Sequence, residues 1–94
     1  MMIRCSRHGD QLGVLMSPDL AELADQGAPA GAHRTLEFEH RGKTVHRMII
    51  SGDFSQAEAV APNRALPLPD DYPDWFNKLV PVCEICATTS LRGS

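Results

Sequence analysis

The clearest apolar pattern in the chain predicts one helix near the N-terminus. Within the stretch SPDLAELADQG, residues 17–27, apolar side chains recur at the spacing of one narrow helix face. These residues are Leu20, Leu23 and Ala24. Ser17 suits the capping position, Pro18 the first helical position and Gly27 the position after the last turn. We therefore expect a helix that begins at Pro18 and ends before Gly27.

Alternation of apolar and polar residues predicts an antiparallel hairpin in the middle of the chain, over residues 34–51. Leu36 and Phe38 alternate with two glutamates, and Gly42 can take the positive φ that a tight turn requires. The second strand mixes apolar and polar residues on both faces, so its register stays open.

Weaker patterns complete the predicted architecture. Residues 2–16 suggest a strand, a bend at Gly9 and a second strand, and residues 55–62 carry a capping-box pattern that predicts one or two helical turns. The proline-rich residues 65–76 should be mostly extended. Residues 74–80 either form a short helix or lead directly into residues 81–86. The sequence thus predicts a small α+β domain with a central antiparallel hairpin or three-stranded sheet and one or two short helices.

Composition places this domain among soluble globular proteins, because 43% of its 94 residues are hydrophobic and 22% are charged. A chain of this length buries a small core, so a metal or a partner would add needed stability. The formal net charge of -3 counts against nucleic acid as a partner. No apolar run is long enough to cross a bilayer, and the N-terminal residues lack the apolar core of a signal peptide. We expect a cytoplasmic protein without a membrane segment.

Two short motifs at the ends of the chain carry the chemistry. CSRH and CEIC each hold two ligand types separated by two residues, and together they use all three cysteines. Three cysteines and one histidine form a standard closed set for tetrahedral structural zinc. The predicted ligands of one Zn²⁺ per chain are Cys5, His8, Cys83 and Cys86. Gly9 allows the bend that a zinc-binding turn needs, whereas Ala87 departs from that preference at the second turn.

The pairing CxxH…CxxC resembles zinc ribbons and related zinc-knuckle domains, in which two ligand pairs lie on separate turns. This resemblance implies metal ligation by the four residues of the two motifs, and residues 9–82, which separate the pairs, exceed the usual ribbon spacing. The implied organisation is one zinc-clasped domain over residues 1–87, in which the ion joins both chain ends, followed by a flexible tail over residues 88–94. Structural zinc contributes on the order of 10 kcal/mol of apparent binding energy.

Other chemistries fit the motifs less well. A redox pair would sit at the start of a helix that follows a strand, and CEIC leaves little chain for such a helix. A nucleobase deaminase needs a glutamate two positions after a histidine, which the sequence lacks. A catalytic zinc would need an open position, with Glu84 or Asp10 nearby if His8 were not a ligand. The CxxC pair can also be merely buried or reactive, with Cys5 and His8 unrelated to it. A second metal site at His40 and His46 is a weaker alternative.

Two surfaces are candidates for partners. Residues 70–76 combine three aspartates with aromatic side chains that suit either an interface or core anchors: Tyr72, Trp75 and Phe76. A basic group near the hairpin can touch phosphate: Arg34, Arg41, Lys43 and Arg47. The favoured interpretation is a non-catalytic zinc protein that binds another protein as an adaptor, regulator or inhibitor. The alternatives are a nucleic-acid-binding zinc domain and, after it, a small zinc-dependent or thiol enzyme.

Overall fold

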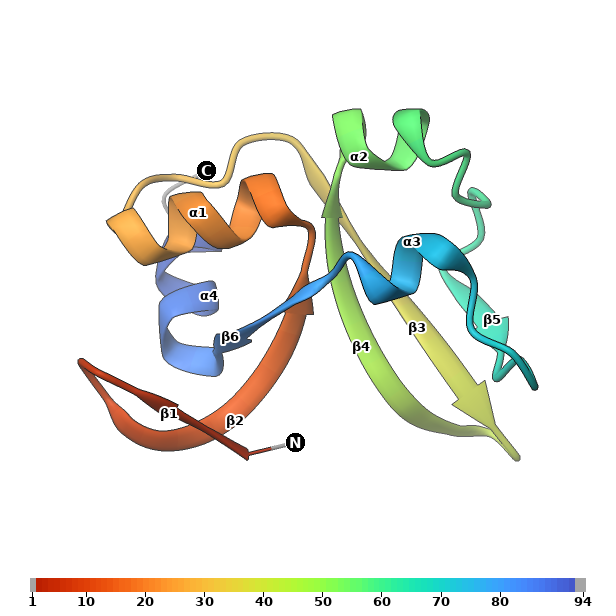
Figure 1. Ribbon diagram of the computed structural model, residues 1–94, viewed down its shortest axis with the longest axis horizontal. Coiled ribbons are helices and arrows are strands. Elements are labelled where there is room, and N and C mark those ends of the chain that lie inside the picture. The colour runs from red at the N-terminus through yellow and green to blue at the C-terminus, as the bar shows by residue number, and fades with distance from the viewer. Residues whose placement is uncertain (1, 93–94) are drawn as a thin grey trace.

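The computed structural model describes residues 2–92 and shows a mixed six-stranded sheet with four short helices (Figure 1). The strands are β1 (Met2–Cys5), β2 (Gly9–Met16), β3 (His33–His40), β4 (Lys43–Ser51), β5 (Ala65–Pro67) and β6 (Val80–Cys83). The helices are α1 (Pro18–Gln26), α2 (Gly52–Ala57), α3 (Asp74–Asn77) and α4 (Glu84–Arg92). This is an α+β fold, as predicted, with a larger sheet and more helices than expected.

The sheet follows the order β1-β2-β4-β3-β5, and β6 pairs with β2 beside this path. β3 and β4 form the predicted central hairpin, closed by a turn in which Arg41 and Gly42 have φ values of 54° and 77°. Positive φ at both central residues is the geometry that matches the twist of a two-residue hairpin. β2 joins β4 in parallel at Leu15 and Met16, which links this hairpin to the terminal strands.

Two buried apolar clusters lie within the fold. The terminal cluster consists of Met16, Leu20, Ala21, Ala24, Ala30, Ile49 and Ala87. The hairpin cluster consists of Leu36, Phe38, Met48, Ile50, Val60 and Leu79. β4 contributes to both clusters, since Ile49 belongs to the first while Met48 and Ile50 belong to the second. A strand covered on both faces lacks the alternation of apolar and polar residues. This is why the register of β4 could not be predicted from the sequence.

The predicted helix is confirmed as α1, with Pro18 in its first turn and Gly27 at a left-handed φ of 72° just past its end. Ser17 occupies the capping position, yet its hydroxyl makes no capping bond. The Ser17 Oγ instead accepts a hydrogen bond from the backbone N–H of Ser51 at 3.2 Å, and the side chain is buried. Ser17 therefore ties α1 to the end of β4.

Several local expectations need correction. The capping residue of α2 is Ser51, whose hydroxyl accepts from the Phe54 N–H at 3.1 Å, so this helix begins before the predicted segment 55–62. Residues 88–92, which the sequence placed in a flexible tail, belong to α4. The rest of that expected tail, residues 93 and 94, lies outside the described residues.

Within residues 2–92, every helix is too short or too polar to span a bilayer.

Candidate metal centre

The first ligand pair lies on the turn between β1 and β2. Cys5 is the last residue of β1 and pairs with Gly9, the first residue of β2, so the loop consists of three residues and ends with His8. Gly9 has a φ of 71°, the left-handed conformation that closes a three-residue hairpin loop. The Gln11 side chain donates to the His8 carbonyl oxygen at 3.0 Å, which fixes the loop. Gln11 was not identified from the sequence, where nothing distinguishes it.

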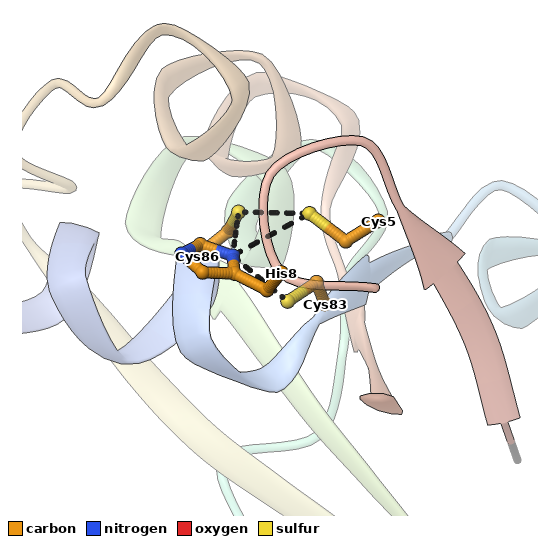
Figure 2. Close-up of side chains that lie close together, drawn as sticks. All are labelled: Cys5, His8, Cys83 and Cys86. Atoms are coloured by element: carbon orange, nitrogen blue, oxygen red, sulfur yellow. Dashed lines mark hydrogen bonds between the residues drawn. The ribbon is translucent and has the colours of Figure 1, made fainter. Parts of the chain in front are cut away.

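The second pair lies where β6 meets α4. Cys83 ends β6, Glu84 begins α4, and Cys86 follows within the first turn of that helix. β6 pairs with β2 in antiparallel register, with Cys83 opposite Gly13. Because β1 pairs with the first half of β2 and β6 with the second, one strand positions both motifs. The four side chains converge between the β1–β2 turn and the start of α4 (Figure 2).

The distances between the four donor atoms fit a tetrahedral metal. The four atoms lie within 4.8 Å of one another. The His8 Nδ1 is 3.5 Å from each of the three sulfurs, and the Cys5 and Cys86 sulfurs are 3.6 Å apart. Zinc bonds of about 2.3 Å to sulfur and about 2.0 Å to nitrogen, at tetrahedral angles, imply S···N separations of about 3.5 Å and S···S separations of about 3.8 Å. The Cys5, His8, Cys83 and Cys86 donors can therefore hold a metal ion.

Burial and hydrogen bonding differ among the thiols, and all three cysteines are free. Backbone N–H groups of Arg7 and His8 point at the Cys5 sulfur and, despite some desolvation, lower the pKa of Cys5 to about 6. Burial, together with the neighbouring thiols of Cys5 and Cys83, raises the pKa of Cys86 to about 11. Cys83 is buried, with 3% of its surface exposed. The first turn thus already stabilises a thiolate, which is the form that binds metal.

The alternatives from the sequence fare differently in the structure. Asp10 forms an ion pair with Arg4 at 3.2 Å, and Glu84 is exposed and lines a different hollow, so neither belongs to the donor set. His46 directs Nε2 to the Tyr72 hydroxyl at 2.9 Å, and His40 is exposed. Among residues 2–92 the Cys5–His8–Cys83–Cys86 group is the one cluster of three or more such donors.

One objection to a redox role was wrong in its premise. The sequence suggested that too little chain followed CEIC to form a helix, yet α4 begins directly after β6. The cysteine pair therefore does sit at a strand-to-helix junction. The sulfurs of Cys83 and Cys86 lie close to the donor atoms of His8 and Cys5, however. In a redox pair the two sulfurs would face only each other.

The aromatic segment lies away from the metal centre. Trp75 and Phe76 pack against the hairpin cluster, so they are core anchors there and do not pack beside the second ligand pair. Their rings lie 5.8 and 5.7 Å from that of Phe38. Tyr72 stacks on Phe76 at 4.4 Å and remains 39% exposed.

The four basic residues near the hairpin do not form one group. Arg34 lies near the start of β3, while Arg41 and Lys43 lie at the far end of the hairpin and Arg47 pairs with Glu37 at 3.4 Å.

Comparison with known proteins adds no relative: no family model, no curated protein and no solved structure matches this chain.

Proposed function

We propose that this chain binds one structural Zn²⁺ and serves as a non-catalytic protein-interaction module. The observation that carries the zinc assignment is the spacing of the donor atoms: each S···N separation is 3.5 Å, the Cys5 and Cys86 sulfurs are 3.6 Å apart, and all four atoms lie within 4.8 Å of one another, which fits a tetrahedral ion. Three thiolates and one imidazole are the donors that zinc prefers, and oxygen ligands typical of magnesium or calcium are absent from this group.

Four protein ligands support a structural and not a catalytic ion. A catalytic zinc keeps a coordination position for water or substrate, and this donor set fills a tetrahedron. The ligands also come from both ends of the chain, so the ion would join β1 to α4 as well as completing two turns. Zinc in this role acts as a part of the fold.

The exposed aromatic surface supports an interaction role. Tyr72 presents an exposed ring, and a hollow of about 440 Å³ beside it is lined by Phe38, Trp75 and three prolines, Pro67, Pro69 and Pro73. Aromatic side chains on a proline-stiffened segment lose little conformational entropy when a partner covers them.

Metal analysis tests the zinc assignment. Protein purified without added zinc should contain about one zinc per chain, and the Cys83→Ser variant should lose it. Ser6→Ala is the matched control, because Ser6 is an exposed residue of the first turn and lies outside the donor set. A folded wild-type protein without metal, or a Cys83→Ser variant that keeps its zinc, would contradict the proposal.

Partner capture from the native host tests the interaction role. The bait is the zinc-loaded protein, and Tyr72→Ala should reduce recovery of its main partner, while exposed Val45→Ala on the hairpin should not. Equal recovery with all three baits would exclude the aromatic surface as the interface.

A thiol–disulfide function is the second candidate, because Cys83 and Cys86 stand at the start of α4. The two functions differ in thiol reactivity. Zinc-bound thiolates should resist alkylation until a chelator is added, whereas a redox pair should react in the protein as purified.

A further inference from the structure

A cationic hollow lies at the outer edge of β3, far along the chain from the metal ligands. It has a volume of about 450 Å³ and is lined by His33, Arg34, Thr35, Pro62 and Arg64. No carboxylate lines it, although the chain as a whole carries a formal charge of -3. Two guanidinium groups beside an imidazole thus form a local positive surface against the overall charge.

Arg34 is fixed in this hollow without a negative partner. Its guanidinium donates to the Asn63 carbonyl oxygen at 3.2 Å, the Ala61 carbonyl oxygen at 2.7 Å and the Ser55 hydroxyl at 3.0 Å. All three acceptors are neutral. Within residues 2–92 the ion pairs join Arg4 to Asp10, Arg47 to Glu37 and Lys78 to Glu58, so neither Arg34 nor Arg64 forms an ion pair. A half-buried guanidinium with two unused N–H donors favours an anion beside it.

The same hollow exposes an open strand edge. Glu37 donates its backbone N–H to the Arg64 carbonyl oxygen at 3.0 Å, so Glu37 directs its backbone groups away from β4. Residues two apart on a strand point the same way, and Thr35 therefore directs its N–H and C=O to that outer edge. β5 runs parallel to β3 and begins only at Ala65, opposite Glu37, so Thr35 has no strand partner on that side.

The hydrogen bonds of β4 show independently that the backbone groups of Thr35 point to the outer edge. The carbonyl oxygen of Ile49, which faces Thr35 across the hairpin, accepts from the Ser17 N–H at 3.0 Å and thus points to the β2 side. Ile49 and Thr35 form a non-hydrogen-bonded pair, which leaves the Thr35 N–H free of the hairpin ladder. An extended segment can pair with this edge in the way β5 does further along.

We propose that this hollow binds an acidic peptide segment of a partner protein, in extended form along β3, with a carboxylate at Arg34 and Arg64. Thr35 supplies the backbone hydrogen bonds, and the guanidinium groups select the negative side chain. The volume exceeds what a lone carboxylate or phosphate fills, which favours an anion that arrives on a chain segment. This inference rests on the proposed role as a protein-interaction module and names the chemistry of the partner.

The test uses two matched peptides and the isotope-labelled, zinc-loaded protein. The probes are acetyl-Val-Glu-Val-Glu-Val-amide and the same peptide with glutamine in place of both glutamates. The acidic peptide should shift the Thr35 amide resonance and slow its hydrogen exchange, and it should bind about tenfold more tightly than the glutamine peptide. Equal binding of the two peptides, or no shift at Thr35, would overturn the proposal.

Variants of two exposed arginines assign the effect. Arg64→Gln should lower affinity for the acidic peptide about tenfold and leave the glutamine peptide unaffected. Arg41→Gln is the control with the same charge change, because Arg41 lies at the hairpin turn, about 20 Å along β3 from Arg34. Equal losses in both variants would mean a nonspecific charge effect and would contradict the site.

Two further readouts separate the competing explanations. Inorganic phosphate is titrated in parallel, and binding of phosphate in preference to the acidic peptide would replace the peptide with a phosphate-bearing partner. Zinc content is measured on every sample. If the protein contains one zinc per chain and does not bind the peptide, only this inference is overturned. If the protein contains no zinc and still binds the peptide, only the zinc assignment is overturned.

Discussion

The two halves of the molecule are held together by different means. The terminal region, made of β1, β2, α1, β6 and α4, has a buried cluster in which four of the seven residues are alanines: Ala21, Ala24, Ala30 and Ala87. The hairpin region, made of β3, β4, β5, α2 and α3, buries Leu36, Phe38 and Ile50 and adds aromatic rings at its rim. Since stabilisation grows with apolar area removed from water, the hairpin cluster gains more per residue than the terminal one.

The four metal ligands all belong to the terminal region, where the apolar core is poorest. A structural zinc contributes on the order of 10 kcal/mol of apparent binding energy, comparable to the whole stability of a small domain. Small side chains allow close approach of α1 and α4, since Ala21 and Ala24 of α1 pack in one cluster with Ala87, the residue next to Cys86. The comparison therefore suggests that metal and apolar core are alternative sources of stability in the two halves.

Removal of the metal should have the largest effect and should act unequally. We expect a chelator to abolish hydrogen-exchange protection in β1, β6 and α4, because the ligands of these elements lose their common ion. Protection in β3 and in the part of β4 that packs in the hairpin cluster should fall less. The measurement is hydrogen exchange followed by residue, with and without chelator.

Re-addition of zinc is the control for this experiment and should restore protection in the terminal region. Equal loss in both regions would mean that the halves unfold as one unit, and the comparison would then fail. Unchanged protection throughout would remove the structural role of the metal.

The converse experiment removes the centre of the hairpin cluster. Phe38 is 2% exposed and its ring lies within 6.5 Å of four other rings. Phe38→Ala should lower the free energy of unfolding by about 3–5 kcal/mol, because it opens a cavity. Urea unfolding followed by circular dichroism measures the loss, and the folded variant should still hold one zinc per chain.

A surface substitution on the same hairpin provides the reference. Val45 is 45% exposed, and Val45→Ala should change the free energy of unfolding by about 0.5 kcal/mol or less. A Phe38→Ala variant that remains folded but loses its zinc would show that the two regions depend on one another after all.

The elements that the sequence predicted best are those fixed by local chemistry. The helix α1, the Gly42 turn and each of the two ligand pairs follow from residues close together in sequence, such as Pro18 and Gly27 for the helix. The spacing of CSRH and CEIC identified all four converging residues because a metal restricts ligand types more strongly than packing restricts apolar ones.

What the sequence did not predict depends on pairing between distant segments. The role of β2 as the strand that positions both ligand pairs has no local signal, because it arises from pairing of Gly13 with Cys83. α4 was missed because its apolar face is small, with Ala87 and Ser90 as its buried residues. The open edge at Thr35 likewise becomes visible only when the start of β5, at Ala65 opposite Glu37, is known.

Overpacking should test whether small residues are required in the terminal cluster. Ala24 is 1% exposed, so Ala24→Leu should lower the free energy of unfolding by about 1–3 kcal/mol and weaken zinc binding, because α1 must move outward. Exposed Ala57→Leu on α2 is the control and should have little effect on either quantity. Urea unfolding and competition with a zinc indicator measure the two. A more stable Ala24→Leu variant would show that the terminal cluster can hold a larger side chain. Its alanines would then not be needed for the close approach of α1 and α4.

Glycine substitutions should give the smallest and most selective effect. Gly9 and Gly27 have φ values of 71° and 72°, and a Cβ at either position would meet no atom within 4 Å. Each change to alanine should therefore cost about 1 kcal/mol through backbone strain alone. Gly9→Ala should in addition weaken zinc binding, since Gly9 closes the turn that holds Cys5 and His8. Competition with a zinc indicator measures that difference, and equal zinc affinities in the two variants would mean that the first turn forms without help from its glycine.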